Sequence, residues 1–140
     1  MCGVVGIISE NNSVAGELYD SLIHLQHRGQ DAAGIMTYSN RFHLKKGTGL
    51  VRDIFDERNM SRLLGHVGIG HTRYPTVGGF SVEEAQPVFT DVPYGISMAH
   101  NGNLVNYTEL SKEIVEKDNR HINSSVDIEI ILHIFSHSMN

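Results

Sequence analysis

Two predicted strands separated by only three residues place the strongest constraint on the fold of this chain. Residues 33–38 and 42–46 flank the dipeptide Ser39-Asn40, and a connection this short joins antiparallel strands. Further strands are predicted at residues 3–8, 66–71 and 95–100. The first of these is apolar almost throughout and is expected to be buried. Because the strands come mostly as neighbours, with helices between only some of them, the pattern favours an α+β fold over a doubly wound sheet.

Apolar residues at helical spacing predict the helices. Asn12 or Ser13 can cap a first helix, which ends near Gly29. Residues 50–64 are predicted to be helical but irregular.

Two further helices are predicted from pairs of polar residues three positions apart, as in a capping box. Asn106 and Glu109 open a helix that runs to about residue 117, and Ser124 and Asp127 open the last one. The apolar face of the last helix is predicted to consist of Ile128, Ile131, Leu132 and Phe135.

Composition and charge exclude several classes of protein. The 140 residues, 40% hydrophobic and 19% charged, are enough for one globular domain. The net charge of −5 and the absence of a Lys/Arg cluster argue against a nucleic-acid partner. No apolar run approaches the roughly 20 residues of a membrane span, and the first residues lack the features of a secretory signal. A cytoplasmic location is therefore expected.

The single cysteine, Cys2, is either a small buried residue or a nucleophile. If the initiator Met1 is removed, the thiol and a free α-amine belong to one residue. The amine has an ordinary pKa of about 7.7–8.0 and can take the proton of the thiol at neutral pH. The position of Cys2 therefore favours a nucleophile that carries its own base.

Other polar residues could serve an amide substrate that is also an amino acid. Asn101-Gly102 follows a strand and offers a side-chain amide and a backbone N–H to a developing oxyanion, although Asn-Gly is also a common turn. The guanidinium of Arg73 suits bidentate binding of a carboxylate. Asp127 could hold an ammonium group, cap its helix, or do both.

The nine histidines suggest a metal site only weakly. His133 and His137 are four residues apart on a predicted helix, but no Glu of the catalytic zinc pattern lies between them. His24 and His27 are three residues apart near a helix end. For both pairs a solvated helix face is the favoured interpretation.

Five segments together resemble the class II, N-terminal-nucleophile glutaminase domain of glutamine amidotransferases, in particular those of purine biosynthesis. The matching segments are Cys2–Ile7, Leu25–Ile35, Gly70–Thr76, Ala85–Pro87 and His100–Leu104. The resemblance implies that Cys2 is the nucleophile and that Asn101 and Gly102 form the oxyanion hole. It implies that Arg73 and Thr76 bind the substrate carboxylate, Asp127 the ammonium group, and that Arg28 holds the N-terminal residue. Residues 73–79, with Tyr74, would close over glutamine as a lid.

The resemblance also implies a fold and partners. The expected fold is the four-layer αββα sandwich of N-terminal-nucleophile hydrolases, with residues 1–140 forming a glutaminase domain truncated at its C-terminal end. Such a domain needs no metal or cofactor. A phosphoribosyltransferase domain, in which magnesium is possible, would follow it in a full-length homo-oligomer. The open alternatives are a sugar-phosphate aminating or asparagine synthetase type of amidotransferase, and a catalytically silent amino-acid-binding module.

Overall fold

The computed structural model describes residues 1–74, 81–118 and 121–139. Its strands are β1 (Gly3–Ile8), β2 (Ala32–Ser39), β3 (Arg41–Thr48), β4 (Val67–Arg73), β5 (Val88–Thr90) and β6 (Ile96–Met98). Its helices are α1 (Ala15–Leu25), α2 (Val51–Ile54), α3 (Glu57–Met60), α4 (Tyr107–Asp118) and α5 (Asp127–Ser138), with short 3-10 helices η1 (Gln26–Arg28) and η2 (Val82–Glu84).

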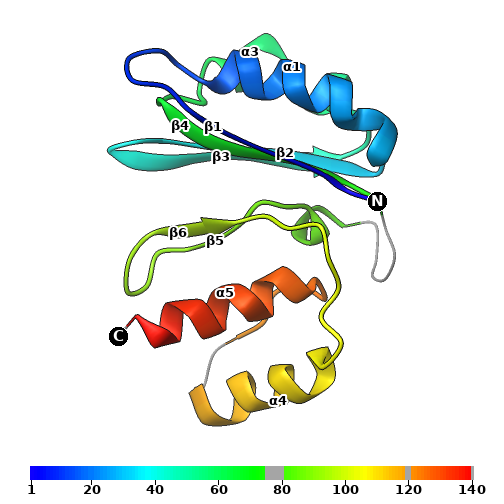
Figure 1. Cartoon of the computed structure of the whole chain (residues 1–140), viewed down its shortest axis with the longest axis vertical. Helices are drawn as coiled ribbons and strands as arrows, with labels where there is room; N and C mark the ends of the chain where they lie inside the picture. The colour runs from blue at the N-terminus through cyan, green and yellow to red at the C-terminus, as the bar shows by residue number, and fades with distance from the viewer. Residues whose placement is uncertain (75–80, 119–120, 140) are drawn as a thin grey trace.

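These elements stack in four layers, in the order helix, sheet, sheet, helix (Figure 1). Helix α1 covers one face of an antiparallel sheet with the strand order β1-β4-β2-β3. The hairpin β5-β6 forms the second sheet, and α5 and α4 lie on its far side. The arrangement confirms the expected α+β fold of the αββα type.

The hairpin and the central strand show how local sequence builds the larger sheet. Asn40 joins β2 to β3 with a φ of 59°, a left-handed conformation that asparagine tolerates better than most residues. In β4, a Cβ at Gly68 would lie 2.6 Å from Leu18 Cδ1 and 2.8 Å from the Met36 carbonyl oxygen. Glycine at this position therefore lets α1 pack closely on the sheet.

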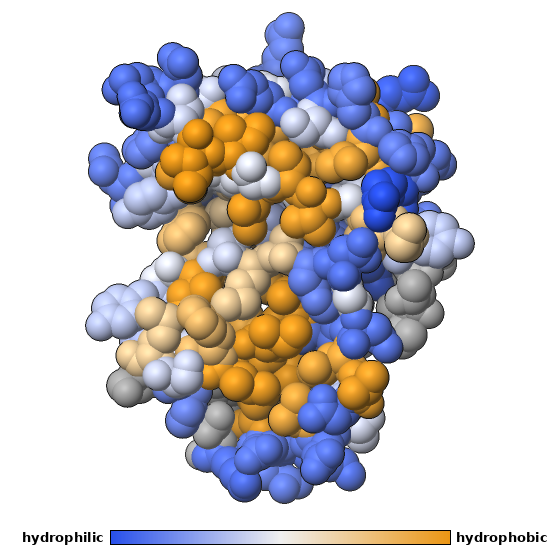
Figure 2. Space-filling model, viewed as in Figure 1, coloured by the Kyte–Doolittle hydropathy of each residue, from blue (hydrophilic) through white to orange (hydrophobic). Residues whose placement is uncertain are grey.

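The two helical layers bury separate cores. The larger core lies between α1, α2 and the four-stranded sheet and is built from Val14, Ala15, Leu18, Leu22, Ala33, Ile35, Val51, Ile54, Phe55 and Leu63. The smaller core joins β5 to α5 and consists of Val88, Val126, Ile128 and Leu132. Between the polar ends of the molecule, apolar surface extends over the middle of the face shown in Figure 2. None of the helices within the described ranges is both long and apolar enough to cross a membrane.

Several local predictions require correction. Val14, rather than Asn12 or Ser13, occupies the N-cap position of helix α1, and no side chain makes a capping hydrogen bond there. Strand β1 is only partly buried, since Val5 and Ile7 pack against the larger core whereas Val4 is 43% and Ile8 81% exposed. Strand β5 was not predicted from the sequence.

The last helix also differs from its prediction. Helix α5 begins after Val126, so Ser124 is not its cap. Phe135 is 47% exposed, whereas Ile130 is fully buried. Because α5 packs against both the β5-β6 hairpin and α4, its buried surface is wider than the single apolar stripe that was predicted.

Candidate active site

Six segments of the chain meet around a cavity of about 300 Å³. They are the N-terminus, the end of β4, the residue before Pro87, the turn after β6, the start of α4 and the start of α5. The residues that line the cavity are Cys2, Arg73, Tyr74, Gln86, His100, Gly102, Asn103, Tyr107, Ser125, Val126 and Asp127.

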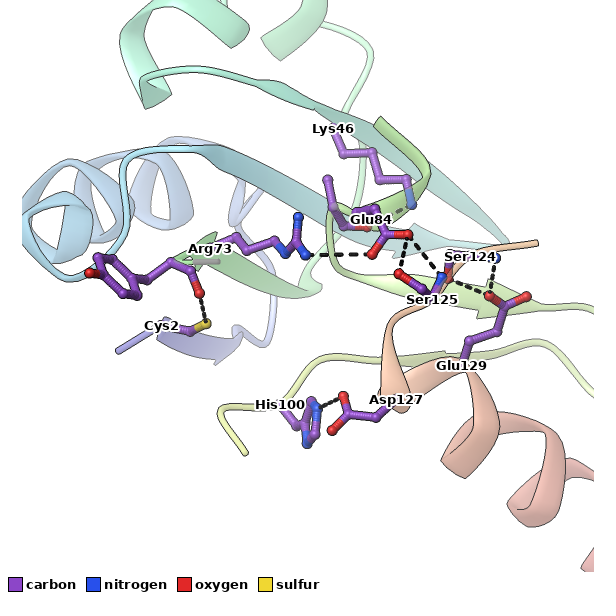
Figure 3. Close-up of polar contacts among 11 residues, drawn as sticks. Cys2, Lys46, Arg73, Glu84, His100, Ser124, Ser125, Asp127 and Glu129 are labelled. Atoms are coloured by element: carbon purple, nitrogen blue, oxygen red, sulfur yellow. Dashed lines mark hydrogen bonds and ion pairs between the residues drawn. The ribbon is translucent and has the colours of Figure 1, made fainter. Parts of the chain in front are cut away.

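The pairing of two strands places Cys2 beside Arg73. Strand β1 pairs with β4 so that Gly3 lies opposite Thr72, which brings the preceding and following residues together. The Cys2 thiol lies 3.8 Å from the carbonyl oxygen of Tyr74, a contact drawn in Figure 3. The thiol is partly exposed and is not part of a disulfide.

The Arg28-Gly29 turn packs against both of these segments. Arg28 Nε donates a hydrogen bond to the carbonyl oxygen of Cys2 at 3.1 Å. A Cβ at Gly29 would lie 2.5 Å from the carbonyl carbon of Arg73 and 2.8 Å from the Tyr74 nitrogen. Only glycine allows this approach, so the turn is in direct contact with the N-terminus and with the end of β4.

Arg73 is buried and ion-paired, with only 5% of its surface exposed. Its Nη2 donates to the carboxylate of Glu84 at 3.5 Å. The other oxygen of that carboxylate accepts from the backbone N–H and the hydroxyl of Ser125, both at 2.8 Å. Glu84 therefore links the end of β4 to the segment that leads into α5 (Figure 3).

Asp127 contacts the turn after β6 and does not cap its own helix. One carboxylate oxygen accepts from His100 Nε2 at 2.7 Å and the other from the backbone N–H of Leu104 at 2.6 Å. Because an ionised carboxylate only accepts, the Nε2 of His100 carries the hydrogen. The capping role considered for Asp127 is thus wrong, since Val126 occupies the N-cap position.

Two buried side chains, Gln86 and His71, hold the turn that carries Asn101 and Gly102. Gln86 Oε1 accepts from the backbone N–H of His100 at 2.8 Å, and His71 Nε2 donates to the His100 carbonyl oxygen at 3.1 Å. Burial lowers the pKa of the His71 imidazole to about 4, so His71 is neutral at pH 7. The cavity wall next to the turn is thereby fixed by neutral hydrogen bonds.

A second buried carboxylate, Glu129, binds the residues just before the cavity wall. It accepts hydrogen bonds from the backbone and side chains of Asn123 and Ser124. Burial raises the pKa of this carboxyl, but the neighbouring His133 and the hydrogen bonds from Asn123 and Ser124 outweigh this effect and bring the pKa to about 2. Glu129 is therefore ionised throughout the physiological range.

The structure brings most of the predicted residues together. Cys2, Arg73, Gly102 and Asp127 line one cavity, and Arg28 contacts Cys2 from outside it. Asn101 lies in the same turn but is exposed and does not line the cavity. Thr76 and most of the expected lid, residues 75–79, lie outside the described residues.

Sequence analysis did not identify Glu84, Gln86, His100 and Ser125 as members of the site. Gln86 and His100 belong to two of the segments that carry the family resemblance, and this was the available signal. Glu84 has no such signal, because its partners are 11 and 41 residues away.

The histidine pairs do not form a metal centre with other ligands. No group of three or more His, Cys, Asp or Glu side chains suitable for a metal ion occurs among residues 1–74, 81–118 and 121–139. The expectation that His133 is solvated is wrong. Its side chain is 13% exposed and its Nε2 lies 3.7 Å from Glu129 Oε1.

Known proteins share both the sequence and the fold. A family model described as a glutamine amidotransferase domain matches residues 55–138. The amidophosphoribosyltransferase of Pseudomonas aeruginosa is 55% identical over 99% of this chain, and that of Escherichia coli is 53% identical over 100% of it. In both cases the chain spans only 28% of the relative's length.

Two solved structures have the same fold over all of this chain. One is described as the allosteric regulatory enzyme of purine biosynthesis, with a TM-score of 0.88 and 34% identity. The other is the glutamine phosphoribosylpyrophosphate amidotransferase of B. subtilis, complexed with ADP and GMP, with a TM-score of 0.85 and 32% identity. This chain covers 30% of each of those chains.

Proposed function

Because the chain belongs to the glutamine amidotransferase domain family, we propose that it hydrolyses the side-chain amide of L-glutamine to glutamate and ammonia. The observation that carries this proposal is the cavity that brings Cys2, Arg73, Gly102 and Asp127 together. Each of these groups matches one part of glutamine. The thiol can attack the side-chain amide, and the backbone N–H can stabilise the resulting oxyanion. The guanidinium suits the α-carboxylate, and the carboxylate suits the α-ammonium group.

The nucleophile in this proposal is Cys2 after removal of Met1. The freed α-amine takes the thiol proton, and the thiolate attacks the amide carbon of glutamine. The tetrahedral intermediate then collapses to a thioester, and the amine returns its proton to the departing ammonia. Water hydrolyses the thioester to glutamate and regenerates the thiol. The hydrogen bond from Arg28 Nε to the Cys2 carbonyl oxygen would hold the residue in place through these steps.

The oxyanion of the intermediate would be stabilised by the Asn101 side-chain amide and the Gly102 backbone N–H. Asn101 belongs to the turn that contributes Gly102 to the cavity wall, and its side chain is exposed. In the proposed reaction this side chain turns toward the amide of bound glutamine. Donors already held in a low-dielectric site stabilise the developing charge at little reorganisation cost.

The α-carboxylate of glutamine would bind Arg73, with help from Thr76, and the α-ammonium group would bind Asp127. An ionised carboxylate offers about four acceptor positions. Asp127 uses two of them for His100 and Leu104. It can therefore keep both hydrogen bonds and still accept from an ammonium group.

For the whole protein we propose amidophosphoribosyltransferase activity, in which the ammonia is transferred to phosphoribosylpyrophosphate. The support is the similarity to amidophosphoribosyltransferases of which this chain spans 28%. The proposal includes a C-terminal phosphoribosyltransferase domain that uses magnesium, a homo-oligomeric assembly, and a cytoplasmic location, where a catalytic thiol stays reduced.

An electrophilic glutamine analogue tests the nucleophile. With the electrophile at the amide position, the analogue should label Cys2 alone, and mass spectrometry should show that Met1 is absent from the labelled chain. The Cys2→Ser variant should stay folded but release no glutamate. Retained Met1 with no labelling would favour the silent binding module.

The acceptor is tested separately, in the protein expressed from its entire reading frame. Glutamine and phosphoribosylpyrophosphate together should yield pyrophosphate and glutamate in equal amounts. Glutaminase activity that is coupled instead to a sugar phosphate or to aspartate would keep the glutaminase proposal and refute the acceptor.

A further inference from the structure

Glu84 is a buried carboxylate whose partners belong to the wall of the cavity. It is 6% exposed and lies in the short helix η2, outside the residues assigned above to chemistry or to substrate binding. It binds Arg73 at 3.5 Å and Ser125 through two hydrogen bonds of 2.8 Å. A charge buried in this way is costly unless it is fully paired, so its contacts determine where its neighbours can lie.

The segment that carries Glu84 is itself fixed to the large sheet. Lys46 Nζ, on β3, donates to the carbonyl oxygen of Ala85 at 2.7 Å. A Cβ at Gly34, on β2, would lie 2.1 Å from the carbonyl oxygen of Gln86, so the two backbones are in close contact. Glu84 thus projects from a base held by β2 and β3.

From this base, Glu84 reaches the residues proposed to bind the two ends of glutamine. Arg73 would bind the α-carboxylate directly. Ser125 lies two residues before Asp127, which would bind the α-ammonium group. Figure 3 shows the carboxylate of Glu84 between Arg73 and Ser125, with Asp127 on the ribbon that continues from Ser125.

Glu129 provides a natural comparison. It is also 6% exposed and also binds the segment before α5. Its hydrogen-bond partners there, Asn123 and Ser124, do not line the cavity, whereas the carboxylate that pairs with Arg73 is Glu84. Glu129 therefore stabilises the same segment through residues that lie outside the cavity wall.

We propose that Glu84 is a positioning residue that fixes the guanidinium of Arg73 and the segment leading to Asp127, and so sets recognition of the α-carboxylate and α-ammonium groups. This inference rests on the proposed glutaminase function. The guanidinium is planar, so holding Nη2 also restricts the plane of the donors that face a carboxylate.

The test compares three substrates in the protein expressed from its entire reading frame. They are L-glutamine, glutamine with its α-carboxylate replaced by a carboxamide, and glutamine lacking its α-ammonium group. In Glu84→Gln, kcat/KM for glutamine relative to the α-carboxamide should fall about tenfold, the equivalent of about 1.4 kcal/mol. The ratio of kcat/KM for glutamine to that for the analogue lacking the α-ammonium group should fall as well. For glutamine itself, KM should change more than kcat. Glu129→Gln, the matched control, should lower the melting temperature and keep both ratios.

An Arg73→Ala background shows whether Glu84 acts through Arg73. There Glu84→Gln should cause no further loss of the glutamine to α-carboxamide ratio, because residues that act through one contact are not additive. If Glu84→Gln does not fold, Glu84→Asp is measured instead, since it keeps the charge but withdraws it from Arg73.

The outcomes separate the two proposals. A parent protein that does not hydrolyse glutamine overturns the proposed function and, with it, this inference. The inference alone is overturned if the parent is active and a folded Glu84 variant keeps both substrate ratios. It is also overturned if the Glu84 substitution lowers the glutamine to α-carboxamide ratio by the same factor in the Arg73→Ala background.

Discussion

His100 donates a 2.7 Å hydrogen bond to the carboxylate of Asp127, and this contact joins two functions of the proposed site. His100 directly precedes Asn101 and Gly102, which would stabilise the oxyanion, while Asp127 would bind the substrate ammonium group. The oxyanion turn and the start of α5 are therefore held at a set distance from each other.

Replacing His100 with Ala should weaken both functions. The variant leaves one oxygen of Asp127 without its partner and loosens the turn, so kcat/KM for glutamine should fall by the equivalent of about 1.5–3 kcal/mol, as for a lost hydrogen bond to a charged group. His66→Ala, at an exposed position after α3, should leave kcat/KM unchanged. Steady-state glutamate release measures both, and a parent-like His100→Ala would show that the contact is unimportant.

Replacing Arg73 with Lys should impair substrate binding more than chemistry. Lysine keeps the positive charge near Glu84 but lacks the planar fork that binds a carboxylate through two hydrogen bonds. The expected loss of glutamine affinity is about 1.5–3 kcal/mol, measured as a rise in KM. Arg52→Lys is the control, since the Arg52 side chain is 72% exposed. Unchanged glutamine affinity in Arg73→Lys would remove Arg73 as the carboxylate ligand.

Replacing Gly29 with Ala should damage both stability and activity. The added Cβ would lie 2.5 Å from the Arg73 backbone, and backbone cannot move aside as a flexible side chain can. Overpacking of this kind costs about 1–3 kcal/mol, and here it displaces Arg73 and Tyr74 from the cavity wall.

Gly16→Ala is the matched control for Gly29→Ala. Gly16 lies inside α1, where a Cβ meets nothing within 4 Å. Alanine should therefore stabilise the helix by about 0.8–1 kcal/mol. Thermal melts and glutamate release distinguish the two variants. The close contact at Gly29 would be disproved if both substitutions raised the melting temperature.

The buried His71 should make folding sensitive to mild acid. Its pKa falls from 6.5 to about 4 on folding, chiefly because burial disfavours the charged form. The unfolded chain therefore binds the proton more readily than the folded chain does. The free energy of unfolding is thus at its full value above pH 6.5 and decreases as the pH falls toward 4. Through this one group, lowering the pH from 7 to 5 should reduce the free energy of unfolding by about 2 kcal/mol.

His71→Gln keeps a donor for the carbonyl oxygen of His100 but does not titrate. Urea unfolding at pH 7 and pH 5 should therefore show a smaller loss of stability in the variant than in the parent. Identical losses would mean that other groups govern this range. The low pKa of Glu129, about 2 against 4.5, acts at more acidic pH and does not interfere.

The local sequence determined the elements whose signals lie within a few residues. The short connection at Ser39-Asn40 predicted the hairpin, apolar spacing predicted α1 and α5, and the pair Asn106 and Glu109 predicted the start of α4 within one residue. The family was also recognisable, because Cys2 and the other matching segments occur in order along the chain. Periodicity and turn chemistry are short-range properties, and sequence displays them directly.

Only the tertiary structure decided which partner each polar side chain binds. Ser124 and Asp127 have the spacing of a capping box, yet Ser124 binds Glu129 and Asp127 binds His100. The role of Glu84 depends on Ser125, 41 residues away. A buried charge must be paired with whatever donor the packed layers bring near it, and that donor is set by how α5 and the two sheets stack, which no local pattern specifies.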